Sequence, residues 1–292
     1  YLNYKNIKNY DLIVLYREAV LTRSILFEKL FANSGVPLVF DFDDAIWIKD
    51  VSNVNRTLSF LKNEKKIEKI LPLCAHVTCG NQYLRDYAIQ FNKNVTILPS
   101  TVNTDLYKPM NINGYSGKVK IGWVGSHTTI KHFQKIINVY RRLKDTYKEK
   151  ISFKVIGDPN YENLELDIVG VPWDNDKEVE LFNSFDIGVM PLPRDNWTEG
   201  KCGMKGLLYM STGKPAVVSD VGANNTIIKD GENGFLCKGE DHWFKVLSEL
   251  IENAQLRNQI GENGRKTVVD KYSTISQRDN YLNLYLSLIN KQ

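Results

Sequence analysis

The chain has 292 residues, 42% of them hydrophobic, so it can bury a substantial core and fits two domains better than one. Its 38 basic and 34 acidic residues leave a formal charge of +4, far from the clustered basicity of nucleic-acid-binding proteins. No apolar run approaches the roughly 20 residues that span a bilayer. These features argue against nucleic acid as a partner and favour a protein that is soluble or peripheral at a membrane. The cysteines, described below, favour the cytoplasm.

Strand-length apolar runs recur between helical patterns along the whole chain. They lie at residues 12–16, 37–42, 76–79, 95–98, 119–124, 151–156, 187–192 and 214–219. Near-continuous apolar runs separated by helices are typical of parallel strands covered on both faces. The sequence therefore predicts an α/β fold. Because the first run already resembles an internal strand of a larger sheet, we also expect a preceding piece of the N-terminal domain.

Helical patterns and turn-rich stretches divide the chain. Residues 131–144 place apolar side chains at spacings of three and four, which predicts a helix. The charge run at residues 62–69 is typical of a solvated helix face. Proline, asparagine and glycine gather at residues 108–117, which we interpret as a linker. The predicted domains are residues 1–110 and 111–272, followed by a closing helical segment, 273–292.

The four cysteines, Cys74, Cys79, Cys202 and Cys237, lack paired spacing, which favours free thiols in a reducing compartment. The four histidines show no ligand spacing, so we expect no metal site.

Two glycine-containing turns follow predicted strands and carry the polar residues of interest. In the first, GSHTTIK from Gly125 to Lys131, a glycine and three hydroxyl residues lead into a helix with an early lysine. Exposed amides and the positive dipole end make a helix N-terminus suitable for a phosphate. A capping threonine and a surface lysine are an equally good interpretation of this turn.

The second turn, EGKCGMK from Glu199 to Lys205, presents the same chemistry more strongly. Glycines at 200 and 203 allow the backbone to approach a ligand, and residues 202–205 are predicted to form a first helical turn. On that spacing Lys201 and Lys205 flank one anion. The apolar residue Met204 is expected in the core. Two such turns facing each other fit a diphosphate.

Several pieces in order resemble one family. They are IGWVGSHTTIK (121–131), KVIGD (154–158), FDIGVMPL (185–192), WTEGKCGMK (197–205), YMSTGKPAVVSDVGANNTII (209–228) and DGENGFL (230–236). Residues 118–276 are similar to the nucleotide-sugar-binding domain of family-four glycosyltransferases, in a sub-branch with a Gly-Lys-Cys-Gly signature. The resemblance implies the GT-B architecture, with two Rossmann-like, doubly wound parallel-sheet domains facing across a cleft. It also implies that the closing helix crosses back to the N-terminal domain.

The resemblance further implies a retaining hexosyltransferase that needs no metal or other cofactor. The donor would be a nucleoside diphosphate sugar, and the acceptor a polysaccharide or lipid-linked glycan. A lysine- and aromatic-rich N-terminal region could contact an anionic membrane surface. The expected donor-diphosphate and sugar residues are Gly125, Ser126, Lys131, Glu199, Lys201, Cys202, Gly203, Met204 and Lys205, with Asp158 at the nucleoside.

The sequence departs from the general family pattern at three positions. Ser126 stands where the family has an arginine, while its lysine falls on Lys131. The two glutamates of the family pattern fall on Gly200 and Leu208. Leucine cannot accept a hydrogen bond from a ribose hydroxyl as a carboxylate does.

Catalysis by such an enzyme requires stabilisation of the leaving diphosphate and of a positively charged sugar carbon. Lys131 and Lys205 are our candidates for the first task. For the second we expect Asp43, at the end of the strand FDFDDA. A turn-forming role for Asp43 and Asp44 is an equally good interpretation.

Two other functions stay open. The pattern Asp41-x-Asp43 after an apolar strand is also found in magnesium-dependent phosphatases of the haloacid dehalogenase type, although Asp44 and Ala45 then depart from that pattern. The missing glutamates are compatible with a sugar-nucleotide-binding protein that has no transferase activity.

Overall fold

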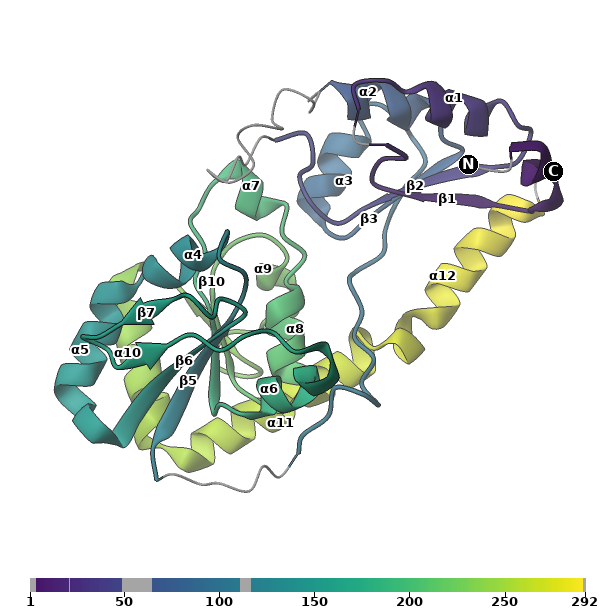
Figure 1. Ribbon diagram of the computed structural model, residues 1–292. Helices are drawn as coiled ribbons and strands as arrows, with labels where there is room; N and C mark the ends of the chain where they lie inside the picture. The colour runs from purple at the N-terminus through teal and green to yellow at the C-terminus, as the bar shows by residue number, and fades with distance from the viewer. Residues whose placement is uncertain (1–3, 21, 49–64, 111–116, 291–292) are drawn as a thin grey trace. The chain divides into compact units, whose positions relative to one another are not determined.

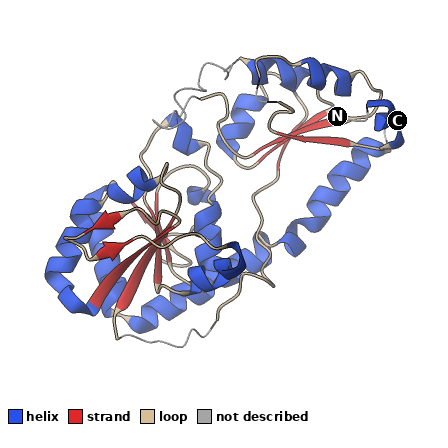
Figure 2. Cartoon of the chain, in the orientation of Figure 1, coloured by secondary structure: helices blue, strands red, loops and turns tan. Residues whose placement is uncertain are grey.

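The computed structural model describes residues 4–20, 22–48, 65–110 and 117–290 (Figures 1 and 2). The chain forms two compact units. Unit 1 comprises Tyr1–Ser100, Asp195–Cys202 and Gln277–Gln292, and unit 2 comprises Thr101–Arg194 and Gly203–Ser276. The first change of unit therefore falls earlier than the boundary expected after residue 110. The centre of the expected linker, residues 111–116, lies outside the described residues.

Unit 1 is built on a parallel sheet in the order β1-β2-β3-β4. The strands are β1 (Ile13–Tyr16), β2 (Leu38–Phe42), β3 (His76–Cys79) and β4 (Val95–Ile97). Its helices are α1 (Leu26–Ala32), α2 (Lys66–Ile70), α3 (Gln82–Ala88) and α12 (Thr274–Ile289), which begins in unit 2. The apolar residues of β2 and β3 are buried because helices cover this sheet.

A buried lysine contradicts one prediction in this unit. Residues 62–64 of the charge run expected on a solvated face lie outside the described residues. In the rest of the run Lys65 and Lys69 are exposed, but Lys66 is only 1% exposed. Its ammonium donates to Glu18 Oε2 at 2.9 Å and to the Val20 carbonyl at 2.7 Å, and lies 3.4 Å from Glu28 Oε1. The pairing stabilises a charge that could not otherwise be buried, which the charge pattern alone does not reveal.

Unit 2 contains a five-stranded parallel sheet in the order β11-β10-β9-β5-β6. The strands are β5 (Val119–Val124), β6 (Ile151–Ile156), β9 (Ile187–Met190), β10 (Ala216–Ser219) and β11 (Phe235–Cys237). Chain order reverses between β5 and β9, which is the switch point where open α/β sheets bind ligands beyond the carboxyl ends of their strands. The eight predicted strands all form, within two residues of their expected bounds. The sequence patterns did not predict β11 or the hairpin of β7 (Glu162–Asn163) and β8 (Ile168–Val169).

Both faces of this sheet are covered, as Figure 1 shows. Along β5, Ile121 and Trp123 join one apolar cluster with α5 (Ile137–Tyr147) and α10 (Gly239–Glu252), while Val124 joins another with α8 (Met204–Ser211). The remaining helices of the unit are α4 (Ile130–Gln134), α6 (Glu178–Asn183), α9 (Asn224–Ile227) and α11 (Ala254–Lys271), whereas α7 (Asn196–Glu199) belongs to unit 1. The single helix expected over 131–144 is thus two, because the backbone leaves the helical conformation at Ile136, with φ −113° and ψ 31°.

The prediction of free cysteines is confirmed. All four cysteines are free, and all four are buried. Across residues 4–290, apart from the undescribed gaps, we find no helix with both the length and the apolar character needed to cross a bilayer.

Candidate functional site

In unit 2, the loop that follows β5 lies at the switch point of the sheet. The Gly125 amide donates to the Ile156 carbonyl at 2.9 Å, which ties this loop to the end of β6. A Cβ on Gly157 would lie 2.4 Å from the Gly125 carbonyl oxygen, so the two loops pack backbone against backbone. Beyond Gly125, the Ser126 and Thr128 hydroxyls pair at 2.8 Å, and Lys131 is exposed on the first turn of α4. The loop therefore presents hydroxyls and a lysine at the carboxyl edge.

The second glycine turn enters α8 differently from the prediction. The helix begins at Met204, with Gly203 as its N-cap at φ 73°, rather than at Cys202. The positive φ favours glycine at this position, and a Cβ there would also lie 2.6 Å from Ile227 Cδ1, which would have to move. Because it stands at the exposed start of the helix, Met204 is 41% exposed and not in the core.

Trp123 joins these two elements. The Lys205 ammonium lies 5.1 Å from the centroid of the Trp123 indole. A Cβ on Gly125 would lie 2.4 Å from the same ring. One buried indole therefore contacts both the loop after β5 and the ammonium of Lys205, which comes from the first turn of α8. Trp123 was not among the predicted site residues, although it lies on β5 two residues before Gly125.

Asp158 lies at the end of β6 and is 6% exposed. Its Oδ1 accepts from the Asn160 amide at 3.3 Å, which is a turn-forming contact. A cavity of about 410 Å³ opens at the carboxyl ends of β9, β10 and β11. Arg194, Asp220, Lys238 and Trp243 are among its lining residues, and Asp220 and Lys238 form an ion pair there.

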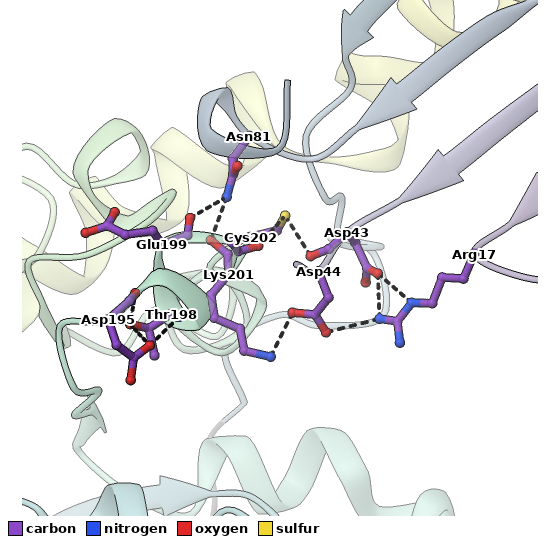
Figure 3. Close-up of polar contacts among 10 residues, drawn as sticks. Arg17, Asp43, Asp44, Asn81, Asp195, Thr198, Glu199, Lys201 and Cys202 are labelled. Carbon is purple, nitrogen blue, oxygen red and sulfur yellow. Dashed lines mark hydrogen bonds and ion pairs between the residues drawn. The ribbon is translucent and has the colours of Figure 1, made fainter. Parts of the chain in front are cut away.

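In unit 1, charged residues from two neighbouring strand ends and from the 195–202 segment form one network (Figure 3). Arg17 donates to Asp43 Oδ1 from Nε at 2.9 Å and from Nη2 at 2.5 Å, and Nη2 also lies 3.2 Å from Asp44 Oδ2. The Lys201 ammonium donates to Asp44 Oδ1 at 2.8 Å. Two cations thus flank the two adjacent carboxylates.

Lys201 lies among residues of unit 1. Its ammonium lies 3.7 Å from the centroid of the Trp197 ring as well as against Asp44. Since α8 begins only at Met204, Lys201 and Lys205 do not share a helix, and the predicted spacing of four helical residues does not apply. Lys201 belongs to unit 1 and Lys205 to unit 2.

Each residue of the Gly200-Lys201-Cys202 sequence has a separate contact within unit 1. A Cβ on Gly200 would lie 2.8 Å from the Ala45 amide nitrogen, so no side chain fits there. A glutamate at this position would require the backbone around Ala45 to shift. Cys202 Sγ donates to the Asp43 carbonyl at 3.1 Å. A Cβ on Gly80 would lie 2.2 Å from that sulfur.

The main chain of the 195–202 segment is also held. The side-chain nitrogen Nδ2 of Asn81 donates to the backbone carbonyls of Glu199 and Lys201, both at 3.1 Å. In Figure 3 the Glu199 carboxylate points away from Asp43 and Asp44. Glu199 therefore contributes its backbone, rather than its side chain, to these contacts.

Burial and charge shift the pKa values of several groups around this network. Burial, followed by the nearby Asp43 and Asp44 carboxylates, raises the pKa of the Cys202 thiol, so it remains a hydrogen-bond donor at neutral pH. Burial together with a hydrogen bond to Asp43 raises the pKa of Tyr16 to about 12. Burial also raises the pKa of Asp41, against the opposing effect of its hydrogen bond from Thr78.

Asp43 and Lys201 of this network were among the predicted site residues, whereas Arg17 and Asn81 were not. The missed signal is positional, because Arg17 and Asp43 follow adjacent parallel strands whose last paired residues are Tyr16 and Asp41. Within the described ranges no cluster of three or more His, Cys, Asp or Glu side chains could hold a metal ion.

Comparisons with known proteins agree on one class. The profile of a family described as Glycosyl transferases group 1 matches residues 110–267. The uncharacterized glycosyltransferase MJ1069 of Methanocaldococcus jannaschii is 24% identical over 276 residues, covering 83% of this chain and 69% of that protein. The capsular polysaccharide biosynthesis glycosyltransferase CapM of Staphylococcus aureus is 31% identical over 101 residues, covering 33% of this chain and 24% of that protein.

The fold has GT-B glycosyltransferases as structural neighbours. One is Anabaena Alr3699/HepE in complex with UDP-glucose, at a TM-score of 0.74 and 14% identity, covering 97% of this chain and 80% of that one.

Proposed function

Since the chain belongs to the Glycosyl transferases group 1 family, we propose that it transfers a hexosyl residue from a nucleoside diphosphate sugar to a glycan acceptor with retention of the anomeric configuration. The observation that carries the proposal is the meeting of the β5 loop and the start of α8 at the Trp123 indole. It gathers the backbone amides at the start of α8 and a lysine beyond the carboxyl ends of the strands, where a diphosphate binds in sheets of this topology.

Departure of the nucleoside diphosphate requires positively charged groups close to its phosphates, which stabilise the negative charge that develops there. In our assignment, Lys131, Lys205 and the amides of Gly203 and Met204 supply this stabilisation, as fixed charges and dipoles do in a partly dry site. Gly125 has no side chain and so leaves room for the diphosphate, and the Ser126 hydroxyl donates to it. Ser126 replaces an arginine with a neutral group, so the two lysines carry the charge.

The remaining site residues belong to the sugar and the nucleoside. We assign Asp43 to the reacting sugar carbon and Asp158 to the nucleoside. Glu199, Lys201 and Cys202 shape the sugar site through the 195–202 segment. For Cys202 this means packing and a hydrogen bond, since its raised pKa makes it a poor nucleophile at neutral pH.

A uridine nucleotide is the first donor to test, because a structural neighbour binds UDP-glucose. Similarity to a capsular polysaccharide enzyme favours a polysaccharide or lipid-linked acceptor, encountered in the cytoplasm and at its membrane surface. We propose that the transfer needs no metal ion or other cofactor. Activity that survives excess EDTA supports this point, and activity restored only by magnesium contradicts it.

Retention is tested by proton NMR of donor turnover. Wild-type protein is incubated with UDP-α-glucose and related donors in the presence of oligosaccharide acceptors. A first-formed α-linked product supports the proposal, whereas a β-linked product contradicts retention while leaving transfer intact. A protein that binds the donor but forms no product with any acceptor supports the alternative of a sugar-nucleotide-binding protein, for which the absence of the two family glutamates is the specific observation.

A further inference from the structure

Asn81 makes contacts on two sides of its amide. It is the N-cap of α3, where its Oδ1 accepts from the Leu84 amide at 2.9 Å. Its Nδ2 donates to the carbonyls of Glu199 and Lys201 (Figure 3). The residue is 7% exposed. Both Nδ2 hydrogens are therefore used on a segment more than a hundred residues further along the chain.

The two accepting carbonyls lie on either side of Gly200. Gly200 itself packs against Ala45 so closely that a side chain is excluded, and the following Cys202 sulfur fits against Gly80. The Lys201 side chain leaves the backbone within this anchored stretch and reaches Asp44 and the Trp197 ring. Asn81 thus fixes the main chain from which the Lys201 ammonium is presented.

The amide is matched to this task in a way that a carboxylate is not. A helix N-cap needs only an acceptor, and aspartate serves there as well as asparagine. The two carbonyls of the 195–202 segment need a donor, which an ionised aspartate lacks. Replacing Nδ2 by an oxygen would therefore remove the donor to the 195–202 segment and keep the acceptor that caps α3.

We propose that Asn81 is a positioning residue for the transfer reaction, acting through Lys201 by holding the 195–202 segment on unit 1. The expected effect on the transfer rate rests on the proposed function. The claim that Asn81 holds the 195–202 segment does not. Replacing the donor by an oxygen sets a carboxylate against two carbonyl oxygens, and the segment then opens more often while α3 keeps its cap.

The test uses Asn81→Asp in the full chain, with two thiols as reporters. Cys202 lies in the held segment, whereas the buried Cys237 lies in unit 2 and serves as internal control. Labelling by iodoacetamide, followed by mass spectrometry of each peptide, reports local opening. We expect Cys202 to react at least about tenfold faster in Asn81→Asp and Cys237 to be unchanged. Equal protection of Cys202 in wild type and variant overturns the proposal, whether or not the protein is a transferase.

The kinetic arm compares Asn81→Asp, Lys201→Met and the double variant. We expect each single variant to lower kcat about tenfold or more, with UDP affinity within about twofold of wild type because the assigned phosphate ligands lie in unit 2. The kcat of the double variant should be no lower than that of Lys201→Met, because both substitutions remove the same contribution, that of a correctly placed Lys201. Independent, multiplying losses overturn the route through Lys201. A wild type with no turnover contradicts the proposed function instead, and the thiol labelling still decides the structural claim.

Discussion

Arg17 holds a single oxygen of Asp43 with two nitrogens of its guanidinium, Nε at 2.9 Å and Nη2 at 2.5 Å. The contact follows from the sheet. Arg17 comes immediately after β1 with φ 61°, and its amide donates to the Asp41 carbonyl at 2.8 Å, which continues the ladder toward β2. The same turn directs the arginine to the carboxylate that follows β2. The orientation of Asp43 is thus fixed by a residue on the neighbouring strand end.

Loss of this contact should slow the reaction. With Arg17→Met we expect kcat to fall about 10- to 100-fold, since a hydrogen bond to a charged group is worth roughly 1.5–3 kcal/mol. Steady-state kinetics with saturating donor provides the measurement. Arg141→Met, which removes an exposed pair with Glu165, is the matched control and should leave kcat unchanged. Wild-type kcat in Arg17→Met would show that Asp43 needs no fixed partner.

The contact between Gly80 and Cys202 should make Gly80→Ala destabilising. The added methyl would lie 2.2 Å from a buried sulfur, and overpacking of this kind costs about 1–3 kcal/mol of unfolding free energy. Cys202→Ala in the same chain should recover part of the loss. Chemical denaturation gives both values. Gly206→Ala is the control, because its Cβ meets only Val218 at 3.7 Å, and there alanine should be neutral or slightly stabilising. Full stability of Gly80→Ala would contradict the tight contact.

Lys66 provides a test of burial against charge pattern. Lys66→Met leaves the Glu18 and Glu28 carboxylates without their cation, and we expect a loss of about 3–5 kcal/mol in unfolding free energy. Lys69→Met, at an exposed position of the same helix, should change stability by no more than about 0.5 kcal/mol. Equal effects of the two substitutions on stability would contradict the burial of Lys66 and would favour the solvated helix face that the charge run predicts.

Asp41 should make unit 1 less stable as the pH rises. Its pKa is raised in the folded protein, chiefly by burial, so the folded state binds its proton more tightly than the unfolded chain does. The stability from this group is therefore full below the unfolded pKa, near 3.8, and is lost as the pH rises through the folded value. Asp41→Asn keeps an acceptor for Thr78 and mimics the protonated form.

The measurement is the melting temperature of wild type and Asp41→Asn from pH 3 to pH 7. We expect the variant to melt higher at pH 7 and the difference to vanish toward pH 3. If Asp41→Asn melts below the wild type at pH 7 and at every other pH tested, the surroundings of Asp41 stabilise the ionised carboxylate, which contradicts the prediction.

Strand positions and fold class could be predicted from the sequence because buried parallel strands leave near-continuous apolar runs such as Val119–Val124. The Gly125 and Gly203 turns were identifiable for a similar reason, since glycine marks close backbone approach. The course of the 195–202 segment could not be predicted, because it depends on contacts with Asn81, Ala45 and Gly80, far away in the chain. Lys66 was misjudged on the same grounds, as its partners are two glutamates outside the local charge run.

The most direct test of the central claim is calorimetric titration of UDP, and of GDP for comparison, into wild type and Lys205→Ala with EDTA present. We predict metal-independent binding of a nucleoside diphosphate to the wild type, weakened about 10- to 100-fold in Lys205→Ala through loss of a charged contact. Lys214→Ala is the control, since that lysine lies just before the amino end of β10, whereas the proposed site lies beyond the carboxyl ends of the strands. Binding that is absent, or equal in wild type and Lys205→Ala, would contradict the assignment of the start of α8 as the diphosphate site.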